Sequence, residues 1–308
     1  MKSSNTGKIL FVGDVSLDLT MVADHVPAPD EKVHADQTVE APGGVVANAA
    51  VACARSGAKV GALLPMGSDT AASVIAMGLR DEGIELQVET VPGRTCRAVV
   101  IVEPHGEKRL LLDPGVSMYP SRQAIEALDL SRVAWVHTAI YGEAADVLVE
   151  RCRAAGIPWS LDLEPASFST GIETVAPLID GAAILFCNDR AAVAIGPEAP
   201  ARLLALGAKA VVRTMGPQGA GFFAAGVERR AAAPLLDKIV DTTGAGDCLA
   251  GWFIGETVGG ASPQAALEAA VAAASLSCRA LGAQNSYPTP IEVAEFRREA
   301  AKAIENIA

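Results

Sequence analysis

The regular alternation of short apolar runs with longer segments rich in alanine, leucine and glutamate restricts the fold of this chain more than any other feature. Six runs have the β-branched, nearly unbroken apolar character of buried strands: residues 8–13, 58–64, 132–138, 157–163, 182–188 and 208–214. Helical patterns separate them, at residues 45–56, 70–83, 121–129, 143–155, 171–180 and 199–206. Such alternation predicts an α/β fold, in which helices cover both faces of a mainly parallel central sheet.

Two regions break this rhythm. Residues 18–40 and 94–112 contain alternating segments typical of antiparallel strands with one solvated face, and the second has Pro104-His105-Gly106 as its turn. We expect these regions to pair into a small sheet that stands off the main one. A final helix is expected at about residues 290–305, after Pro288-Thr289-Pro290.

Composition excludes several classes of partner. The 308 residues carry a formal net charge of −11, which argues against nucleic acid or an anionic membrane as the main partner. Six cysteines are scattered with no CxxC pair, so the usual zinc and thioredoxin spacings are absent. The first apolar run is too short for a signal peptide, and the alanine-rich stretch near residues 264–280 is interrupted by Glu268. We therefore expect a reducing, cytoplasmic location.

The stretch IVDTTGAGDCLAGWF, residues 239–253, joins a glycine-rich turn to the start of an apolar helix, with Asp247 directly after the turn. A helix start exposes backbone N–H groups and carries partial positive charge, which makes an anion site. A carboxylate beside such a site suits phosphoryl transfer, as the base for an incoming hydroxyl. The simpler alternative is an ordinary helix cap, for which Thr242 or Thr243 would suffice.

Two common nucleotide-binding patterns are missing. The P-loop pattern GxxxxGK[ST] occurs nowhere in the chain, which disfavours a P-loop NTPase. The first strand is followed by Asp14-Val15-Ser16, so no dinucleotide-binding GxGxxG follows it. A nicotinamide-dependent oxidoreductase is therefore disfavoured.

Several motifs, in order along nearly the whole chain, resemble those of the ribokinase/PfkB family of carbohydrate and nucleoside kinases. DTTGAGD (241–247) is similar to the family's C-terminal signature, and APGGVVANAAVACARSGAKV (41–60) to its N-terminal glycine signature. GDVSLD (13–18) resembles the strand-end motif that carries a substrate aspartate. Further matches are MGSD (66–69), GEKR (106–109), LDLEP (161–165), TMGPQG (214–219) and GAQNSYPT (282–289).

The resemblance implies an overall fold and an activity. The fold would be a three-layer αβα sandwich formed by residues 1–308 as a single domain, with lid segments at about 18–40 and 94–112. The activity would be ATP-dependent transfer of the γ-phosphate to a hydroxyl of a small sugar of the ribose, fructose or keto-deoxy type. In many relatives the lids also pair between subunits, so a homodimer through the lid is expected.

The resemblance also assigns the transfer step. Asp247 would be the base that takes the hydroxyl proton, and the backbone of Gly244, Ala245 and Gly246 would hold the γ-phosphate. Asp241 and Thr243 would line a monovalent-cation site, with potassium as the expected ion and Ser286 as a candidate to complete it.

Sugar-binding residues follow from the two N-terminal motifs. Asp18 matches the aspartate that holds sugar hydroxyls, and an ionised aspartate accepts several hydrogen bonds. Ser16 and Asp14 would share its face if the segment is extended. The paired glycines Gly43 and Gly44 would let the backbone approach the sugar. Asn48 would offer the sugar both a hydrogen-bond donor and a hydrogen-bond acceptor.

Nucleotide-binding residues lie in the second half of the chain. Thr214, Gly216 and Gly219 match the strand and turn that cradle ATP, and Asn188 matches the first residue of the family's N-x-x-E motif, which orders Mg²⁺. The glutamate position is Ala191 here, so we expect an altered Mg²⁺ requirement. Asp189 is the neighbouring carboxylate that could partly substitute.

The substrate is left open by the sequence. Val45 stands where ribokinase-like members carry a lysine, and Glu143 is only a loose candidate for an expected sugar-contacting glutamate. The lid hairpin carries Arg97, Lys108 and Arg109, which suit either an acidic or phosphorylated sugar or a solvated surface. A nucleoside kinase, which the scarcity of aromatic residues disfavours, and a non-catalytic sugar- or nucleotide-binding homologue are the alternatives.

Overall fold

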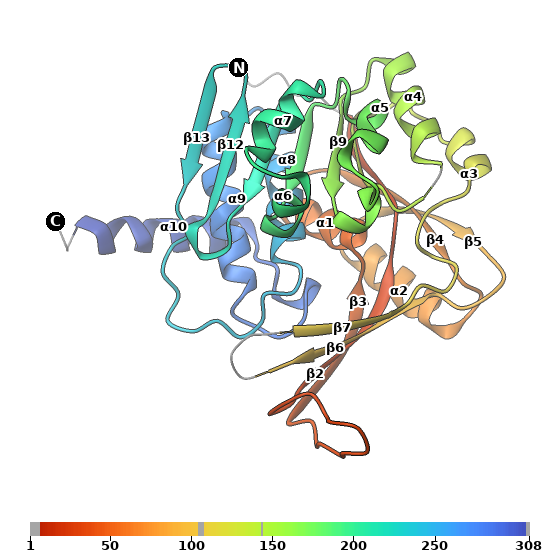
Figure 1. The fold of residues 1–308 in the computed structure, drawn as a ribbon, viewed down its shortest axis with the longest axis vertical. Helices are drawn as coiled ribbons and strands as arrows, with labels where there is room; N and C mark the ends of the chain where they lie inside the picture. Colours follow the sequence, from red (N-terminus) through yellow and green to blue (C-terminus); the bar gives the residue numbers. More distant parts are fainter. Residues whose placement is uncertain (1–6, 104–107, 143, 306–308) are drawn as a thin grey trace.

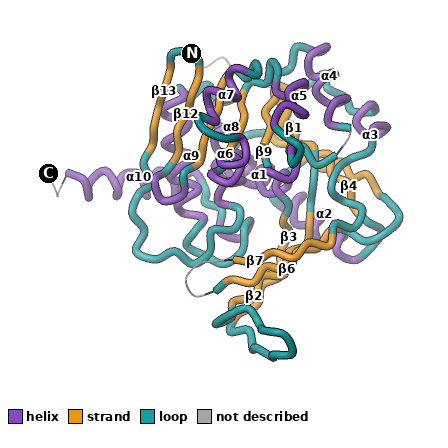
Figure 2. The backbone as a smooth tube through the Cα atoms, viewed as in Figure 1, coloured by secondary structure: helices purple, strands orange, loops and turns teal. Residues whose placement is uncertain are grey.

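The computed structural model describes residues 7–103, 108–142 and 144–305, and within them a large sheet, a small sheet and helices on both faces of the large one (Figures 1 and 2). This arrangement confirms the predicted α/β class with a separate lid sheet. Within the described ranges, no helix combines the length and the apolar character needed to cross a membrane.

The large sheet has nine strands in an order that places the first strand of the chain well inside it. The order is β13 (Val227–Ala231), β12 (Ala220–Ala224), β11 (Ala210–Thr214), β10 (Ile184–Cys187), β9 (Trp159–Leu163), β8 (Val133–Ala139), β1 (Lys8–Val12), β4 (Val60–Met66) and β5 (Glu85–Thr90). Neighbours from β11 to β5 are parallel, whereas β12 and β13 join antiparallel. The carboxyl ends of the parallel strands therefore meet along one edge, where α/β folds bind ligands.

Helices form the two outer layers. One face is covered by α1 (Val45–Arg55), α2 (Thr70–Asp81), α8 (Ala245–Val258), α9 (Pro263–Ser277) and α10 (Pro290–Glu305). The other is covered by α3 (Arg122–Glu126), α4 (Ala145–Ala155), α5 (Ala176–Ile179), α6 (Asp189–Ile195) and α7 (Ala199–Ala205). Each layer buries its own apolar cluster against the sheet, which is why the parallel strands are apolar on both faces.

Some elements differ from the sequence-based expectation. The runs that form β5, β12, β13 and α6 were not predicted as separate elements, because they are short or partly exposed. The helix expected at 171–180 is instead a 3₁₀ turn (Ile172–Val175) followed by the single turn of α5. Pro177 lies in that turn and lacks a backbone N–H, so it disfavours a continuous helix. The remaining 3₁₀ turns are Pro165–Phe168, Gly216–Gln218 and Gln284–Ser286.

The lid is a four-stranded sheet made by the two regions that break the alternation. Its order is β3 (Gln37–Gly43), β2 (Ser16–Val22), β6 (Cys96–Val102) and β7 (Lys108–Asp113). Each region forms an antiparallel pair, as predicted, but the two pairs join through parallel β2 and β6. The predicted turn at 104–106 lies outside the described residues.

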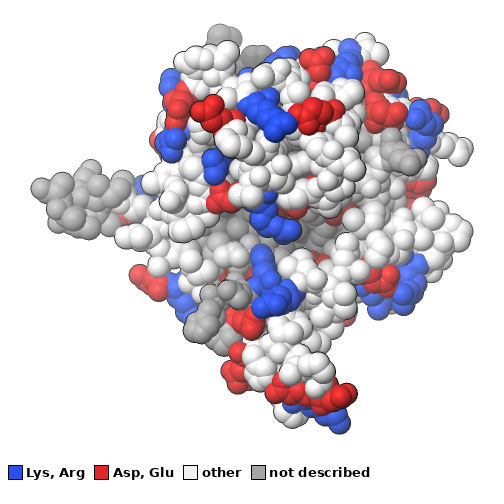
Figure 3. Space-filling model, in the orientation of Figure 1, with Lys and Arg blue, Asp and Glu red and all other residues white. Residues whose placement is uncertain are grey.

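The lid has an inner face that meets the body of the protein. Ala98 and Val100 on this face pack with Leu281, and the register places Asp18 beside Ala98. Figure 3 shows a hollow where the lid meets the body, with Lys and Arg side chains on both sides of it. Asp18 thus belongs to the lid face that looks toward the carboxyl edge of the large sheet.

Helices α1 and α8 pack so closely that their backbones touch. A Cβ placed on Gly251 would lie 2.2 Å from the carbonyl oxygen of Ala49, and one on Gly255 would lie 2.2 Å from Ser56 Oγ. These two glycines are four residues apart, so they form one face of α8. The missing side chains allow α8 to lie directly against α1, although the two helices are far apart in the sequence.

We predict that Gly251→Ala destabilises the protein, because a methyl group there forces the two helix backbones apart. Overpacking of this kind typically costs about 1–3 kcal/mol. Gly78→Ala is the matched control, since its Cβ would meet only Pro42 Cγ, at an ordinary 3.7 Å. The control should gain up to about 1 kcal/mol from helix propensity. Urea unfolding of both variants measures the difference, and equal stabilities would contradict the close contact.

Candidate active site

The start of α8 is built to receive an anion. Gly244 precedes the helix with a left-handed backbone (φ +73°), and no side chain caps the helix there. An α-helix leaves its first N–H groups without intrahelical acceptors and with partial positive charge. A Cβ placed on Gly246 would meet nothing within 4 Å, so open space lies beside its backbone. Open space and unengaged helix-start N–H groups therefore occur together around Gly246, while the Ala245 N–H makes a long bond of 3.4 Å to the carbonyl oxygen of Thr242.

Asp247 follows this opening, in the first turn of α8, and its carboxylate is held from α1. Asn48 Nδ2 donates a hydrogen bond of 2.8 Å to Asp247 Oδ2. Burial, together with the charges of Asp14 and Glu164, raises the pKa of Asp247 to about 7, even though the bond from Asn48 and the charge of Lys108 lower it. A carboxylate with a pKa near neutrality is suited to accept a proton at physiological pH.

Asn48 is itself fixed by a second amide. Gln284 Nε2 donates to Asn48 Oδ1 at 3.0 Å, and both residues are buried. The sequence predicted Asn48 as a sugar contact, and the structure adds a bond to Asp247 that sequence alone did not suggest. One N–H of the Asn48 amide is not used by these two bonds and can still meet a ligand.

Asp18 and Ser16 share a face of β2, as the alternation predicted, and Ser16 Oγ donates to Asp18 Oδ1. Burial raises the pKa of Asp18, and the bond from Ser16 opposes that shift. Gly43 lies so near that a Cβ on it would be 2.1 Å from Asp18 Oδ2. The glycine at 43 is therefore required by the position of the carboxylate next to it.

Asp14 has a structural contact that the sequence did not predict. Its carboxylate accepts hydrogen bonds from the backbone N–H groups of Val45 (2.9 Å) and Val46 (3.0 Å), and so caps α1 from another segment. Burial raises the pKa of Asp14 to about 6, even though these bonds lower it. The preceding Gly44 has φ +99°, and a Cβ there would be 2.7 Å from Val15 Cα. Asp14 thus fixes the paired-glycine turn from which α1 begins.

Asn188 caps α6 and bonds to the carboxylate of the residue directly after β9, Glu164. Its Oδ1 accepts from the backbone N–H of Ala191 at 2.8 Å, and its Nδ2 donates to Glu164 Oε1 at 3.2 Å. Burial raises the pKa of Glu164, while the charge of Arg190 and the bond from Asn188 lower it. Glu164 was not among the predicted site residues, although its position directly after a buried strand was the available signal.

The two positions considered for the missing family glutamate turn out differently. The side chain of Ala191 is fully buried in the apolar cluster beneath α6. The Asp189 carboxylate is exposed and accepts from Arg213 Nη2 at 3.0 Å. Glu164, and not Asp189, therefore places a carboxylate next to Asn188.

Asp162 is a further buried carboxylate at the same edge of the sheet. The register places it between Ala139 of β8 and Phe186 of β10, and Phe186 packs against Phe253 of α8 with ring centroids 6.1 Å apart. Burial raises the pKa of Asp162 well above its usual value, and the charges of Glu164, Asp247 and Asp14 add to the shift. Acidic groups from several strands and helices thus converge at this edge.

The predicted nucleotide turn contains two glycines with different physical reasons. Gly219 has φ +90°, and a Cβ on it would lie 2.0 Å from the carbonyl oxygen of Ala231, so the packing of β13 requires it. Gly216, which follows Thr214 and β11, has φ +52° and open space where a Cβ would be. Gly216 therefore leaves room for a ligand, whereas Gly219 is explained by the fold alone.

Asp241 is buried, with both carboxylate oxygens engaged. Oδ1 accepts from Thr243 N (2.9 Å) and Thr243 Oγ1 (2.7 Å), and Oδ2 accepts from Gly282 N (3.0 Å). Ser286 Oγ bonds to the carbonyl oxygens of Gly282 and Ala283 in the same loop. All these donors to Asp241 are neutral, so its buried negative charge suits a nearby cation. The loose candidate Glu143 lies outside the described residues.

Comparisons with known proteins agree with this geometry. Residues 6–290 match the model of the pfkB family of carbohydrate kinases. The ribokinase of Bacillus subtilis is 30% identical over 294 residues, covering 94% of this chain and 98% of its own, and that of Schizosaccharomyces pombe is 28% identical over 311 residues, covering 92% and 96%. The structure of Arabidopsis thaliana ribokinase complexed with ribose and ATP superposes with a TM-score of 0.82 at 26% identity, over 94% of this chain and 98% of that one.

We predict that Asn48→Ala raises the pKa of Asp247 above its value of about 7, because the bond from Asn48 favours the charged carboxylate. A bond to a charged group is worth about 1.5–3 kcal/mol, so the rise should be about one unit or more. Carbon NMR titration of aspartate-labelled protein measures it, with Asp247→Asn to identify the signal. Asn285→Ala, an exposed asparagine of the Gln284 turn, is the control and should leave the titration unchanged.

Proposed function

The chain belongs to the pfkB family of carbohydrate kinases, and on this basis we propose that it transfers the γ-phosphate of ATP to a hydroxyl of a neutral sugar of the ribose type. The carbohydrate-kinase activity follows from the family and its ribokinase relatives. The observation that carries the proposal is Asp247, with its raised pKa, beside the open start of α8. The other acidic residues near this carboxylate disfavour a keto-deoxy acid or sugar phosphate whose negative group would lie close to it.

We assign the chemical step to the first turn of α8. Asp247 Oδ1 accepts the proton of the sugar hydroxyl, because Oδ2 is already bonded to Asn48. The hydroxyl oxygen forms the new bond to the γ-phosphorus as the bond to the leaving oxygen of ADP breaks. The backbone donors around Gly244, Ala245 and Gly246 hold the negative charge of the transferred group.

The sugar is held between the lid and α1. Asp18 accepts hydrogen bonds from two hydroxyls, and the glycine at 43 lets the chain pass close to the carboxylate. The remaining Asn48 donor contacts the sugar while its other bonds hold Asp247. Closure of the lid over the site would exclude water, which otherwise competes with the hydroxyl.

ATP and Mg²⁺ are assigned to the carboxyl ends of β9, β10 and β11. Asn188 and Glu164 offer oxygen ligands for Mg²⁺ or its waters, and Thr214 and Gly216 border the nucleotide. Gly219 supports that turn through its packing on β13. When bound, Mg²⁺ neutralises charge on the phosphates. Glu164 would supply the carboxylate that the family motif provides through a glutamate at the position of Ala191.

A potassium ion is also part of the proposal. The buried Asp241 carboxylate with Thr243 and the carbonyl groups of the neighbouring loop fit a monovalent cation, because no charged donor offsets Asp241 in its own bonds. The ion would act on the electrostatics of the anion site next to it.

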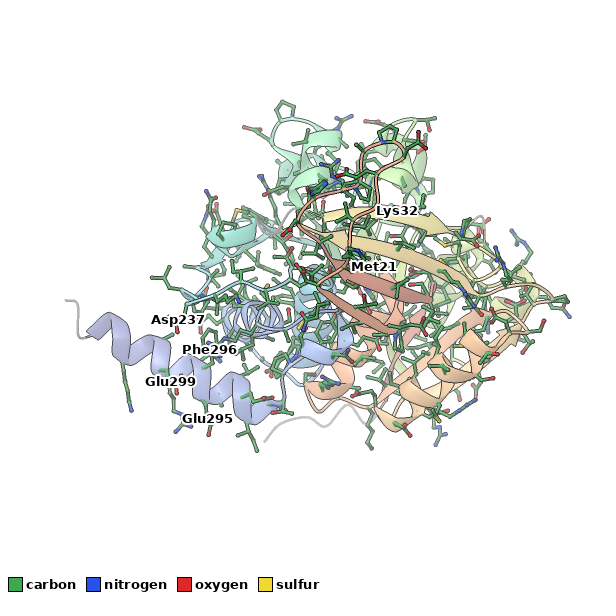
Figure 4. The ribbon with its side chains drawn as sticks, turned by 90° about the horizontal axis from the view of Figure 1, so that it is seen from below. Met21, Lys32, Asp237, Glu295, Phe296 and Glu299 are labelled. Atoms are coloured by element: carbon green, nitrogen blue, oxygen red, sulfur yellow. The ribbon has the colours of Figure 1, made fainter. Side chains whose placement is uncertain are left out.

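We further propose a homodimer through the outer face of the lid. Alternation places Met21, Val99, Ile101 and Leu111 on that face, and Leu111 of the edge strand β7 is 73% exposed. Figure 4 shows Met21 on the lid sheet, and Lys32 in the connection between β2 and β3 that stands off it. An open apolar sheet face and an edge strand favour pairing with a second copy. We propose that residues 1–308 act as a single domain that includes the lid. The six buried free thiols support a reducing, cytoplasmic location.

An ADP-release screen over pentoses, hexoses, keto-deoxy acids, sugar phosphates and nucleosides tests the function. We expect turnover with a neutral pentose or hexose, and faster turnover in potassium than in lithium chloride. Asp247→Asn should lower kcat by about 10²–10⁴-fold, the usual scale for a general base. Wild-type turnover in that variant would refute the role of Asp247, and turnover with nucleosides alone would replace the substrate assignment.

Glu164→Gln should raise the Mg²⁺ concentration needed for half-maximal activity several-fold, because an amide is a weaker ligand than a carboxylate. The kinase rate is measured against free Mg²⁺ at constant ATP. Asp189→Asn removes a neighbouring carboxylate that is committed to Arg213, so it is the matched control and should leave the Mg²⁺ dependence unchanged. The reverse pattern would assign the metal to Asp189.

Leu111→Lys should convert the dimer to a monomer, because it places a charge in the proposed interface. Sedimentation velocity of the variant and the wild type measures the change. Val193→Lys is the control, since Val193 is 82% exposed on α6, away from the lid. A wild-type monomer at high concentration would refute the dimer.

A further inference from the structure

The loop between α9 and α10 touches the proposed transfer site at three places, although none of its residues was assigned a catalytic part. We call residues 282–287 the C-terminal loop. Gly282 N donates to Asp241 Oδ2 at 3.0 Å, and Tyr287 Oη donates to the carbonyl oxygen of Gly244 at 2.8 Å. The third contact runs from Gln284 to Asn48, and Asn48 in turn bonds to Asp247.

We propose that Gln284 is a positioning residue for Asp247 and acts through Asn48. The proposal rests on the function proposed above for Asp247, and it concerns a residue that contacts neither the base nor the substrate. Gln284 Nε2, Asn48 Oδ1, Asn48 Nδ2 and Asp247 Oδ2 form a chain with steps of 3.0 and 2.8 Å.

The chain fixes the orientation of one amide. An asparagine side chain can present either its oxygen or its NH₂ group toward a neighbour, and only the NH₂ group stabilises a carboxylate. The Gln284 NH₂ group donates at every pH near neutrality, and its hydrogen-bond acceptor among the described residues is the oxygen of Asn48. Gln284 therefore holds the Asn48 NH₂ group on Asp247 Oδ2, which leaves Oδ1 as the oxygen that takes the proton.

Burial makes this orientation costly to change. Asn48 is 4% and Gln284 7% exposed, so water cannot readily replace the bond between them. Without Gln284, Asn48 Oδ1 would be a buried acceptor with no donor, and the amide would reorient to find one. Its bond to Asp247 would weaken, and the base would hold its proton up to a higher pH.

Tyr287 provides an internal comparison in the same loop. Its hydroxyl bonds to the Gly244 carbonyl, which also accepts from the N–H of Cys248. Tyr287→Phe removes a hydrogen bond at the anion site and leaves the Gln284–Asn48 bond in place. It should lower kcat without moving the pH at which activity falls.

The experiment is the pH dependence of kcat/KM for the sugar found by the screen. Asp247 must be deprotonated to act, so activity should fall as the pH drops below about 7. In Gln284→Met the pH at which activity falls should rise by about half a pH unit or more. In Tyr287→Phe the pH at which kcat/KM falls should stay at the wild-type value. Gln123→Met changes an exposed glutamine of α3, and it should alter neither kcat/KM nor the pH at which it falls. If this pH does not change in folded Gln284→Met, the proposal is overturned.

Two further measurements test whether Gln284 acts through Asn48 and whether this role holds independently of the proposed kinase activity. In the Asn48→Ala background, Gln284→Met should cause no additional shift, because the intermediate amide is gone; a further shift of the same size would overturn the proposal. The NMR titration of Asp247 reports the same change in protein without ATP, so the proposal can succeed or fail even if the wild type transfers no phosphate. Gln284→Leu serves if Gln284→Met does not give the wild-type melting profile.

Discussion

The contact between the backbones of α1 and α8 is the constraint on which the rest of the site depends. It exists because Gly251 and Gly255 present no side chain to α1, so the helix that carries Asn48 lies directly against the helix that carries Asp247. Asp14 fixes the start of α1 through two backbone bonds, and the C-terminal loop fixes the start of α8 through Gly244. The position of the base is thus determined by the close packing of these two helices and by the segments that fix their first turns.

The same arrangement explains how several carboxylates coexist at one edge of the sheet. Asp14 is stabilised by the N–H groups of α1, and Asp247 lies at the start of α8 with an amide on one oxygen. Asp162 lies within β9 and Glu164 directly after it, and burial favours the neutral forms of both. The neutral sugar that we propose would suit these surroundings, and Lys108 of the lid and Arg190 of α6 place positive charge near Asp247 and Glu164.

How much the sequence could predict depended on whether a feature is local. Residues close together in the sequence determine the alternation of strands and helices, the lid segments and the glycine turn before Asp247. The structure confirms the α/β class and the lid. The bond of Asn188 to Glu164, and that of Gln284 to Asn48, join residues 24 and 236 positions apart. No periodicity specifies such pairs, since they follow from the register of strands and the packing of helices. The parallel β2–β6 pair escaped prediction for the same reason.

The distance in sequence between Asn48 and Asp247, 199 positions, has a consequence for how the molecule is made. The N-terminal strand β1 lies between β4 and β8, and α1 packs against these strands on one side and against α8 on another. In a chain emerging from the ribosome, the side of this alanine- and valine-rich helix that faces α8 therefore stays uncovered until more than four-fifths of the chain has been synthesised. Contacts between segments so far apart form slowly, because the entropy of closing the long intervening loop is lost before the contact stabilises the chain.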